Sequence, residues 1–519
     1  MIDLSKIYSV PKDVAEDIVM KETRHPYYSV VLDRAKIMNS WFQAEYDEYT
    51  AISSTVFSDK SYIIEQSTIE SDDEYTERLK RMKLFPLEQK FFAAQQRIYD
   101  ENNVNRMFPE NKDFWKYKSG NFDDAGCSIT EFYRDKVMFV KEVLGFGAVV
   151  TDLMMDNEGE PVLDDSGNVV PYNFVLRPHE IFNFQVKQGV LTLLVTRQMY
   201  YDVQNIKKFK WTAYTPEYIC VYTQENNMKQ KVLEIDNPFG EVPATLLKGQ
   251  TDANSSFVVG KPRRYSLKGM YLASSELFYD LKKGSELFGH PIPVLTDSIV
   301  RSLAGVADDD QYDSRTIKEG VGMAIIIPDD QTIPNNMLYQ ADMQGLQHLR
   351  DVIFGDLMSL IFSMAMVRDK SLVKSNVSGA AKRFDNVDEQ GLLASTAMDM
   401  EMIENQVLRR MAKVRDEDFE NYIVTYSKHY DLSSADEIFS DITEGMQYKA
   451  MPLPLLVKLT AEYMRKRSMP QEDIEEVTNY FKEYGMPKSS ADLRNLLDIL
   501  PQEELARQVQ LGIESNSEQ

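Results

Sequence analysis

Three long helical segments, with a short β-rich segment between the first two, constrain the fold more than any other feature of this chain. A helix is expected over residues 267–288, and it stops at Gly289-His290-Pro291, because a glycine followed by a proline ends a helix. Short strands are expected at 292–295 and 321–327. Two further helices are then predicted at 342–367 and, after a polar segment, up to about residue 415.

The spacing of apolar residues supports both later helices. In the second helix they recur every three or four positions: Leu346, Leu349, Ile353, Leu357, Leu360 and Met364. The third helix repeats the pattern over seven positions: Leu393, Ala397, Met400, Ile403, Val407, Met411 and Val414. Such spacing predicts one continuous apolar face on each helix.

The segments on either side differ in character. Residues 1–143 are predicted to be mostly helical, with a helix start at Ser71-Asp72-Asp73-Glu74, whose carboxylates suit the positive end of a helix dipole. Residues 145–250 contain short runs rich in Val, Tyr, Phe and Thr, separated by Gly, Pro or Asn, which predict an antiparallel sheet or sandwich. Residues 450–519 are predicted to be helical again, so the expected fold class is α+β.

The charge balance excludes several functions. The chain has 58 basic and 82 acidic residues and a net charge of −24, which excludes histone-like binding of duplex DNA and disfavours an anionic membrane surface. No stretch approaches the roughly 18–20 apolar residues of a membrane span, and the N-terminus lacks the pattern of a secretory signal. Cys127 and Cys220 are expected to be thiols of a reducing compartment. We therefore expect a soluble intracellular product.

No complete motif for catalysis occurs in the chain. Ser378-Gly379-Ala380-Ala381-Lys382 lacks the first glycine of a phosphate loop, and Gly145-Phe146-Gly147 lacks the third glycine of a dinucleotide-binding turn. The five histidines are too far apart in sequence for a metal pair, and the acidic turns at 156–160 and 164–167 lack calcium-loop spacing. We predict no catalytic, cofactor-binding or metal site, although 82 carboxylates leave an acid–base pair unassignable from sequence.

Two charged segments stand out within the run of three helices. Residues 368–383 carry five basic side chains against the single acid Asp369: Arg368, Lys370, Lys374, Lys382 and Arg383. A basic loop between two helices can reach phosphate groups, although a solvated connection between helices is the simpler interpretation. The other segment is an acidic loop between the two expected strands, with Asp308, Asp309, Asp310 and Asp313.

At this point the sequence resembles the portal proteins of tailed bacteriophages. The segment from Tyr271-Leu272-Ala273-Ser274-Ser275-Glu276 to His290-Pro291-Ile292-Pro293-Val294-Leu295 is similar to that family's helix followed by a proline-containing strand. Ser378-Gly379-Ala380-Ala381, followed by Leu392-Leu393-Ala394, resembles the S-G-x-A opening of its long kinked helix. Asp73-Glu74-Tyr75-Thr76-Glu77-Arg78-Leu79 resembles an N-terminal helix of one portal subgroup, and Arg177-Pro178-His179-Glu180-Ile181 its "P-x-x-I" start of a wing strand.

The resemblance implies a portal-like α+β fold in seven parts. These are a wing at 1–266, a first stem helix at 267–288, an α/β clip at 289–338, a second stem helix at 339–367, a tunnel loop at 368–381, a long kinked helix that returns to the wing at 382–448, and a helical crown and tail at 449–519. In a ring, the apolar faces of the stem helices pack either in the subunit core or against the neighbouring subunit.

The resemblance also implies the function. Portals form rings, usually of twelve subunits, at one capsid vertex, through which double-stranded DNA is packaged and ejected. The implied partners are the major capsid protein, the scaffolding protein, the terminase large subunit and a head–tail adaptor, with assembly in the host cytoplasm, a final place in the virion and no membrane. The motor ATPase is a separate protein, so the chain is not expected to be an enzyme or to hold a cofactor.

The two charged loops acquire roles in this interpretation. Arg368, Lys370 and Lys374 of the tunnel loop would touch the DNA backbone weakly and without sequence preference. The four aspartates would belong to the clip, and a negative channel wall would keep DNA from adhering. Two alternatives remain: another phage ring such as a head–tail adaptor or baseplate protein, and a carboxylate- and metal-dependent hydrolase such as a nuclease or glycosidase.

Overall fold

The computed structural model divides the chain into two compact units, Met1–Tyr430 and Asp431–Gln519. The structure describes residues 10–43, 63–68, 70–100, 103–108, 113–155, 161–164, 166–201, 206–225, 228–251, 259–288, 292–296, 325–327, 338–339, 344–367, 379–428, 430, 438–439, 442–443, 452–467 and 471–484. Both helices and antiparallel sheets are present, so the fold class is α+β.

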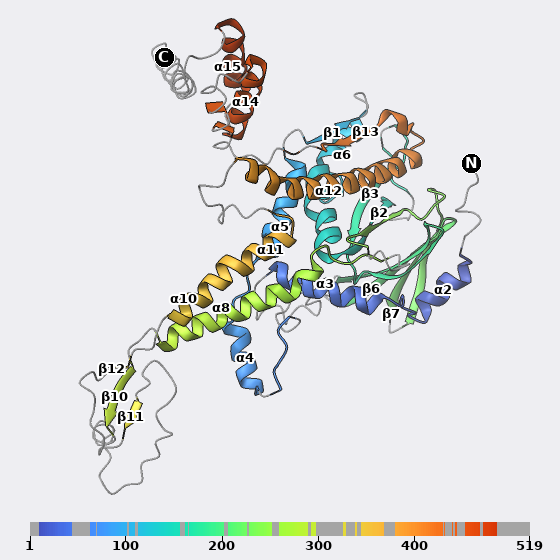
Figure 1. Cartoon of the computed structure of the whole chain (residues 1–519). Coiled ribbons are helices and arrows are strands. Elements are labelled where there is room, and N and C mark those ends of the chain that lie inside the picture. Colours follow the sequence, from blue (N-terminus) through green and yellow to red (C-terminus); the bar gives the residue numbers. More distant parts are fainter. Residues whose placement is uncertain are drawn as a thin grey trace, which may run out of the picture. The chain divides into compact units, whose positions relative to one another are not determined.

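The larger sheet of the first unit is a five-stranded antiparallel meander (Figure 1). Its strands follow the chain in order: β4 Ile181–Lys187, β5 Val190–Tyr201, β6 Lys207–Tyr214, β7 Tyr218–Glu225 and β8 Met228–Asp236. Helix α2, Lys12–Met20, packs on one face and shares an apolar cluster with Phe182 and Trp211.

A second sheet packs against the other face. It has the order β3-β2-β9 and comprises β2 Phe146–Leu153, β3 Pro171–Leu176 and β9 Ala244–Lys248. Phe146 and Val150 of this sheet lie in one apolar cluster with Phe184 and Leu194 of the larger sheet. The predicted antiparallel β region is therefore confirmed, and it consists of two sheets that share a core.

Helices N-terminal to the strands complete the body of the first unit. They are α3 Tyr28–Gln43, α4 Asp72–Arg81, α5 Leu87–Gln96 with η3 Arg97–Tyr99, α6 Asp113–Gly120, and the continuous helix of α7 Ile129–Glu131, η4 Phe132–Val137 and η5 Val140–Leu144. Ser71 and Ser128 each begin a helix with a capping box, in which the serine hydroxyl accepts from the N3 amide and the N3 glutamate accepts from the serine amide.

The predicted run of three helices is confirmed (Figure 1). Helix α8, Lys268–Phe288, leads to a small sheet in which β10 Ile292–Thr296 pairs in parallel with β11 Ile325–Ile327 and antiparallel with β12 Leu338–Tyr339. The chain returns along α8 through α10 Gln344–Asp351, the π-helical turn η8 Val352–Leu357 and α11 Met358–Met364.

The third helix is α12, Gly379–Val414, with 36 residues, and it packs across β2 and β9. It begins inside the loop predicted at 368–381, because Gly379, Ala380 and Ala381 join the helix instead of the connection. After α12 come η9, Phe419–Asn421, and β13, Ile423–Tyr426, which pairs with β1, Val104–Met107.

The second unit contains α14, Leu453–Lys466, and α15, Gln471–Tyr484. Its core combines side chains of both helices with residues from the segment before them: Ile438, Ile442, Leu456, Met464, Ile474, Val477 and Phe481. The helices predicted further along, at 489–499 and 502–512, lie outside the described residues.

Several elements have no counterpart in the predictions. These are the short strands β1, β9 and β12; the helices α2 and α6 lie in the region predicted to be mostly helical, but the prediction did not delimit them. Cys127 and Cys220 are free thiols, as expected. Within the described ranges, none of the helices has the length and apolar character needed to cross a bilayer.

Candidate functional site

Both predicted charged loops lie outside the described residues. Arg368, Lys370 and Lys374 fall in the segment between α11 and α12, and Asp308, Asp309, Asp310 and Asp313 fall between β10 and β11. The structure does describe the helices that carry these loops, so the candidate site is the paired helices and the base on which they stand.

Aromatic and small residues hold α8 against the returning helices. A Cβ atom on Gly284 of α8 would lie 2.7 Å from Cδ2 of Leu346, so this glycine permits the close approach of α10. Phe278 and Phe354 meet edge to face with ring centroids 6.2 Å apart, and Phe85 contacts both rings. The helix pair therefore has its own aromatic core.

The π-helical turn η8 changes which side chains of the second helix face inward. A π turn adds one residue relative to α-helical spacing, so the inward face moves along the sequence by one position. Ile361 and Ala365 are buried, whereas Leu360 and Met364 are 49 % and 51 % exposed. The predicted continuous stripe is thus wrong beyond Leu357, and its last two members form an exposed apolar pair.

A buried ion pair fixes the base of α8. Arg264 lies just before α8. It pairs with Glu88 of α5 at 2.7 Å and donates to Gln95 at 2.6 Å. The Tyr271 hydroxyl donates to the same carboxylate at 3.2 Å. Burial lowers the pKa of Arg264, but Glu88 more than compensates, so the pKa of Arg264 is raised above its ordinary value.

A second buried network adjoins the first. Glu142 of η5 pairs with Lys141 at 2.6 Å and with Arg263 at 2.5 Å, and Lys141 also pairs with Asp399 of α12 at 2.8 Å. Burial alone would raise the pKa of Glu142, but the two cations lower it to about 2. Consecutive arginines, Arg263 and Arg264, thereby tie the start of α8 to two different helices.

Helix α12 is tied to the rest of the first unit along most of its length. Five pairs join it, or the turn directly after it, to other parts of the chain: Arg97–Glu389, Lys141–Asp399, Arg106–Glu404, Arg410–Glu241 and Arg415–Asp164. Arg106 and Glu404 are joined by two hydrogen bonds, of 2.5 and 3.1 Å, and the carboxylate is fully buried. Helix α11, on the other side of residues 368–378, packs through Ile361 and Phe362 in one apolar cluster with Phe91 of α5, so both flanking helices are anchored to one scaffold.

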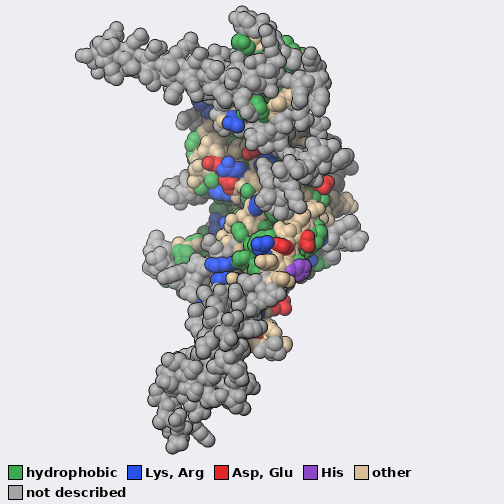
Figure 2. Space-filling model, turned by 60° about the vertical axis from the view of Figure 1, so that its left-hand side comes forward, with side chains coloured by type: hydrophobic (Ala, Val, Ile, Leu, Met, Phe, Trp, Pro, Cys, Tyr) green, Lys and Arg blue, Asp and Glu red, His purple; other side chains and the backbone are tan. Residues whose placement is uncertain are grey.

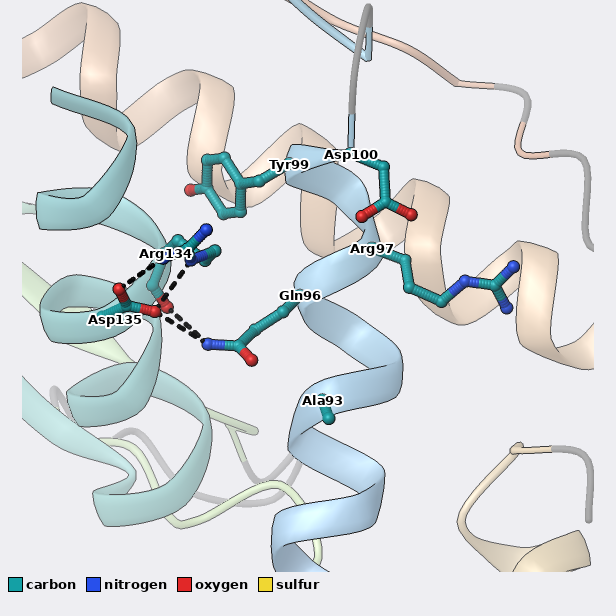
Figure 3. Close-up of a pocket in the computed structure, with 7 residues that line it drawn as sticks. All are labelled: Ala93, Gln96, Arg97, Tyr99, Asp100, Arg134 and Asp135. Atoms are coloured by element: carbon teal, nitrogen blue, oxygen red, sulfur yellow. Dashed lines mark hydrogen bonds and ion pairs between the residues drawn. The ribbon is translucent and has the colours of Figure 1, made fainter. Parts of the chain in front are cut away.

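One polar pocket of about 330 Å³ lies between α5, η3 and η4 (Figure 3). Gln96, Arg134 and Asp135 point toward one another, and Asp135 accepts from Arg134 at 2.9 and 2.8 Å and from Gln96 at 3.1 Å. Arg97 and Asp100 point away from this group. Gln96, Arg134 and Asp135 thus already satisfy one another, which leaves the pocket without an evident ligand.

The described part of the chain gives no support to the alternative of a carboxylate- and metal-dependent hydrolase. Within it, no three His, Cys, Asp or Glu side chains are grouped so that they could hold a metal ion. The buried carboxylates Glu88, Glu142 and Glu404 are each neutralised by an arginine or lysine, as structural ion pairs are.

The scaffold residues were not predictable as partners. Arg263, Arg264, Glu88 and Glu142 look like ordinary helix-surface charges in the sequence. The one available signal is that Glu88 sits three and four positions before Phe91 and Phe92, on a helix face that proves to be buried.

Comparison with known proteins adds no identification. No protein-family model matches the chain, and no curated protein matches its sequence.

Proposed function

We propose that this chain is the portal protein of a tailed bacteriophage. In this proposal it forms a ring, usually of twelve subunits, at one capsid vertex, and double-stranded DNA enters and leaves through the ring. Its partners would be the scaffolding and major capsid proteins, then the terminase large subunit, and finally a head–tail adaptor. The virion would be its final location.

The arrangement of the helix pair carries the proposal. Helix α8 runs out to a small three-stranded sheet, and α10, η8 and α11 return alongside it (Figure 1). The next described element is the 36-residue helix α12, which is fixed to the body of the unit by ion pairs. This order agrees with the two stem helices, clip and long helix that the sequence resemblance implies.

The exposed apolar pair on α11 supports a ring. Leu360 and Met364 lie one helical turn apart, and each is about half exposed. Side chains of this kind favour a protein partner, because an apolar surface gains free energy when it leaves water. In the proposed ring, the neighbouring copy covers them.

The charge distribution is compatible with a DNA channel. The net charge is −24, yet on the described part of the face shown in Figure 2, Lys and Arg side chains lie among acidic and hydrophobic ones. A channel that DNA must slide through needs weak contacts, since tight binding to phosphates would oppose movement. We therefore assign Arg368, Lys370 and Lys374 to weak, sequence-independent contacts with the DNA backbone.

The native mass and negative-stain image of the purified full chain test this function. We expect a ring with a central hole and a mass near twelve times 59.9 kDa. A compact dimer or tetramer without a hole would contradict the proposal. In that case a Mg²⁺-dependent cleavage assay on DNA and on glycosides would be the next measurement.

A pair of charge variants tests the proposed contact between subunits. L360D/M364D should leave the monomer folded, because both side chains are exposed, and should reduce ring formation. V14D/M20D places the same charges on exposed apolar side chains of α2 and is expected to assemble normally. Circular dichroism and thermal melting of both variants show whether the subunits remain folded.

A further inference from the structure

An alternating row of cations and aromatic rings lies at the edge of an apolar core of the first unit; its central ring, Phe182, is fully buried, and Arg24 is exposed. It runs from the start of α3 over β4 and β5 to β6. We call it the cation–aromatic ladder, and its six members, in order, are Tyr28, Arg24, Phe182, Arg197, Phe209 and Lys207.

Each inner ring of the ladder lies between two cations. The Arg24 guanidinium carbon is 5.1 Å from the centroid of Tyr28 and 5.9 Å from that of Phe182. The Arg197 guanidinium carbon is 5.5 Å from Phe182 and 5.0 Å from Phe209. These distances lie within the range of cation–π attraction, so the rings hold both arginines in place.

The two ladder arginines, of which Arg24 is exposed and Arg197 half-buried, differ from those described arginines whose guanidinium pairs with a carboxylate. Arg81, Arg134 and Arg350 each pair with a carboxylate at 2.7–2.9 Å. For Arg24 and Arg197, no carboxylate lies within ion-pair distance among the described residues. The nearby acid Glu22 pairs with Lys229 at 2.9 Å, and Arg197 and Arg24 also help to lower its pKa from a greater distance.

A partly buried histidine, His179, lies next to the ladder and near two arginines. Burial lowers the pKa of His179 to about 4, and repulsion from Arg177 and Arg197 contributes in the same direction. Arg177 is exposed. Arg177 and Arg197 therefore both lie close to His179, and Arg24 contacts the ring of Phe182 that Arg197 also contacts.

The geometry favours carboxylates as the ligand of this surface. A guanidinium carries its N–H groups in its own plane, where they can donate two parallel hydrogen bonds to a carboxylate. The inner rings already face cations, so they offer little room for the base stacking that supports binding of single-stranded nucleic acid. The three arginines and Lys207 also make fewer cations than the roughly 6–10 phosphate contacts of a strongly salt-dependent duplex-binding protein.

We propose that the cation–aromatic ladder is the docking surface for an acidic segment of a partner protein, whose Asp or Glu side chains pair with Arg24 and Arg197. Guanidinium groups that are held by aromatic rings and lack a carboxylate partner complement carboxylates in charge. The docking surface is independent of the proposed portal function, and its test does not involve ring assembly.

Fluorescence anisotropy with the purified full chain tests the proposal. The probe is a labelled Glu-rich peptide, and a labelled oligothymidine of the same length serves as the nucleic-acid comparison. We expect the peptide to bind more tightly than the oligonucleotide, and the affinity to fall with added salt. R24A/R197A should weaken peptide binding by about tenfold or more, because it removes two charge-assisted contacts.

Two further variants make the test specific. R24K/R197K keeps both charges and loses the planar fork, so it should bind with intermediate affinity. R81A/R350A removes two exposed arginines that are paired with carboxylates and should bind like the wild type. Melting temperatures of all variants verify that they are folded.

Three results would overturn the proposal. They are absence of peptide binding to the wild type, equal affinity of the wild type and R24A/R197A, and tighter binding of oligothymidine than of the peptide. The last result would assign the surface to nucleic acid instead.

Discussion

Met366 ends α11 in the left-handed conformation, with φ of +57°. Its amide donates to Ser363 O at 3.0 Å, and the amide of Val367 donates to Phe362 O at 3.1 Å, which is the Schellman arrangement of a helix C-terminus. Glycine normally occupies this position, because a Cβ atom is unfavourable there. A strained residue therefore stands directly before the proposed tunnel loop.

Replacing this residue by glycine should stabilise the chain. M366G removes the Cβ conflict, and little burial is lost because Met366 is half exposed, so we expect a gain of about 1 kcal/mol. M364G, two residues earlier in regular helix, should instead cost about 1 kcal/mol. Thermal unfolding of both variants checks the prediction, and a loss of stability in M366G would contradict it.

The ionisation of Glu142 should make stability depend on acid pH. Its pKa is lowered from 4.5 to about 2 in the folded state, so its charge stabilises the fold above pH 4.5, and this contribution disappears between pH 4.5 and 2. The shift corresponds to about 3 kcal/mol at neutral pH. E142Q should therefore be about 3 kcal/mol or more less stable than the wild type at pH 7.

The difference in free energy of unfolding between E142Q and the wild type should become smaller at pH 3, because protonation of the Glu142 carboxylate removes the stability that its charge gives the wild type. Urea unfolding at both pH values measures it. E77Q is the matched control, because Glu77 forms an exposed pair with Arg81 and should contribute less than about 1 kcal/mol at either pH. If the two proteins differ in free energy of unfolding by the same amount at pH 7 and pH 3, Glu142 acts through packing alone.

At the scale of elements, Gly145 joins the continuous helix that ends at Leu144 to strand β2. It has φ of +79°, and a Cβ atom there would overlap the backbone of Lys261 and Pro262. Gly126 also has a positive φ, of +93°, but a Cβ atom there would meet open space. A comparison of substitutions at the two glycines therefore separates the cost of backbone strain from the cost of steric crowding.

G145A should be much more destabilising than G126A. Both substitutions place alanine in the left-handed region at a cost of about 1 kcal/mol, and G145A must also displace the chain before α8, for a total of about 3 kcal/mol or more. Thermal melting of the two variants provides the measurement. Similar losses in both would mean that the segment at 261–262 moves aside freely.

Local sequence signals predicted most elements of the first unit. Helices that begin with a capping serine, and strands of branched and aromatic residues between tight turns, are specified by residues close in sequence. Strand β9 was not predicted, because Ala244–Lys248 is short and pairs with β2, about a hundred residues earlier in the chain. The exposure of Leu360 was not predicted, because no residue type specifies the π turn that changes which side of the helix faces inward.

The candidate site was less predictable than the fold. The sequence indicates the helix pair, but the networks at its base depend on which of 82 carboxylates meets which cation. Arg264 and Glu88, for example, are 176 positions apart and meet only because α5 packs beside the start of α8. Tertiary contacts of this kind leave no trace in local composition or periodicity.

At the scale of the whole molecule, the proposed function makes demands that partly oppose each other. A ring around moving DNA must hold its subunits firmly and its cargo loosely. Buried ion pairs tie α8 and α12 to the body of the first unit, so force on either helix passes into that body. A chain with a net charge of −24 repels DNA except where a local basic segment attracts it.

Charge reversal in the proposed tunnel loop tests whether contacts between subunits and contacts with DNA are made by different residues. K370E/K374E should leave ring assembly intact, since the stem contact proposed at Leu360 and Met364 is unchanged, and should impair packaging or retention of DNA because the loop then repels phosphates. Complementation of a phage that lacks its portal measures the length of packaged DNA, with K80E/K83E on exposed lysines as control. Packaged DNA of normal length in K370E/K374E would remove the loop from the mechanism and leave the ring proposal standing.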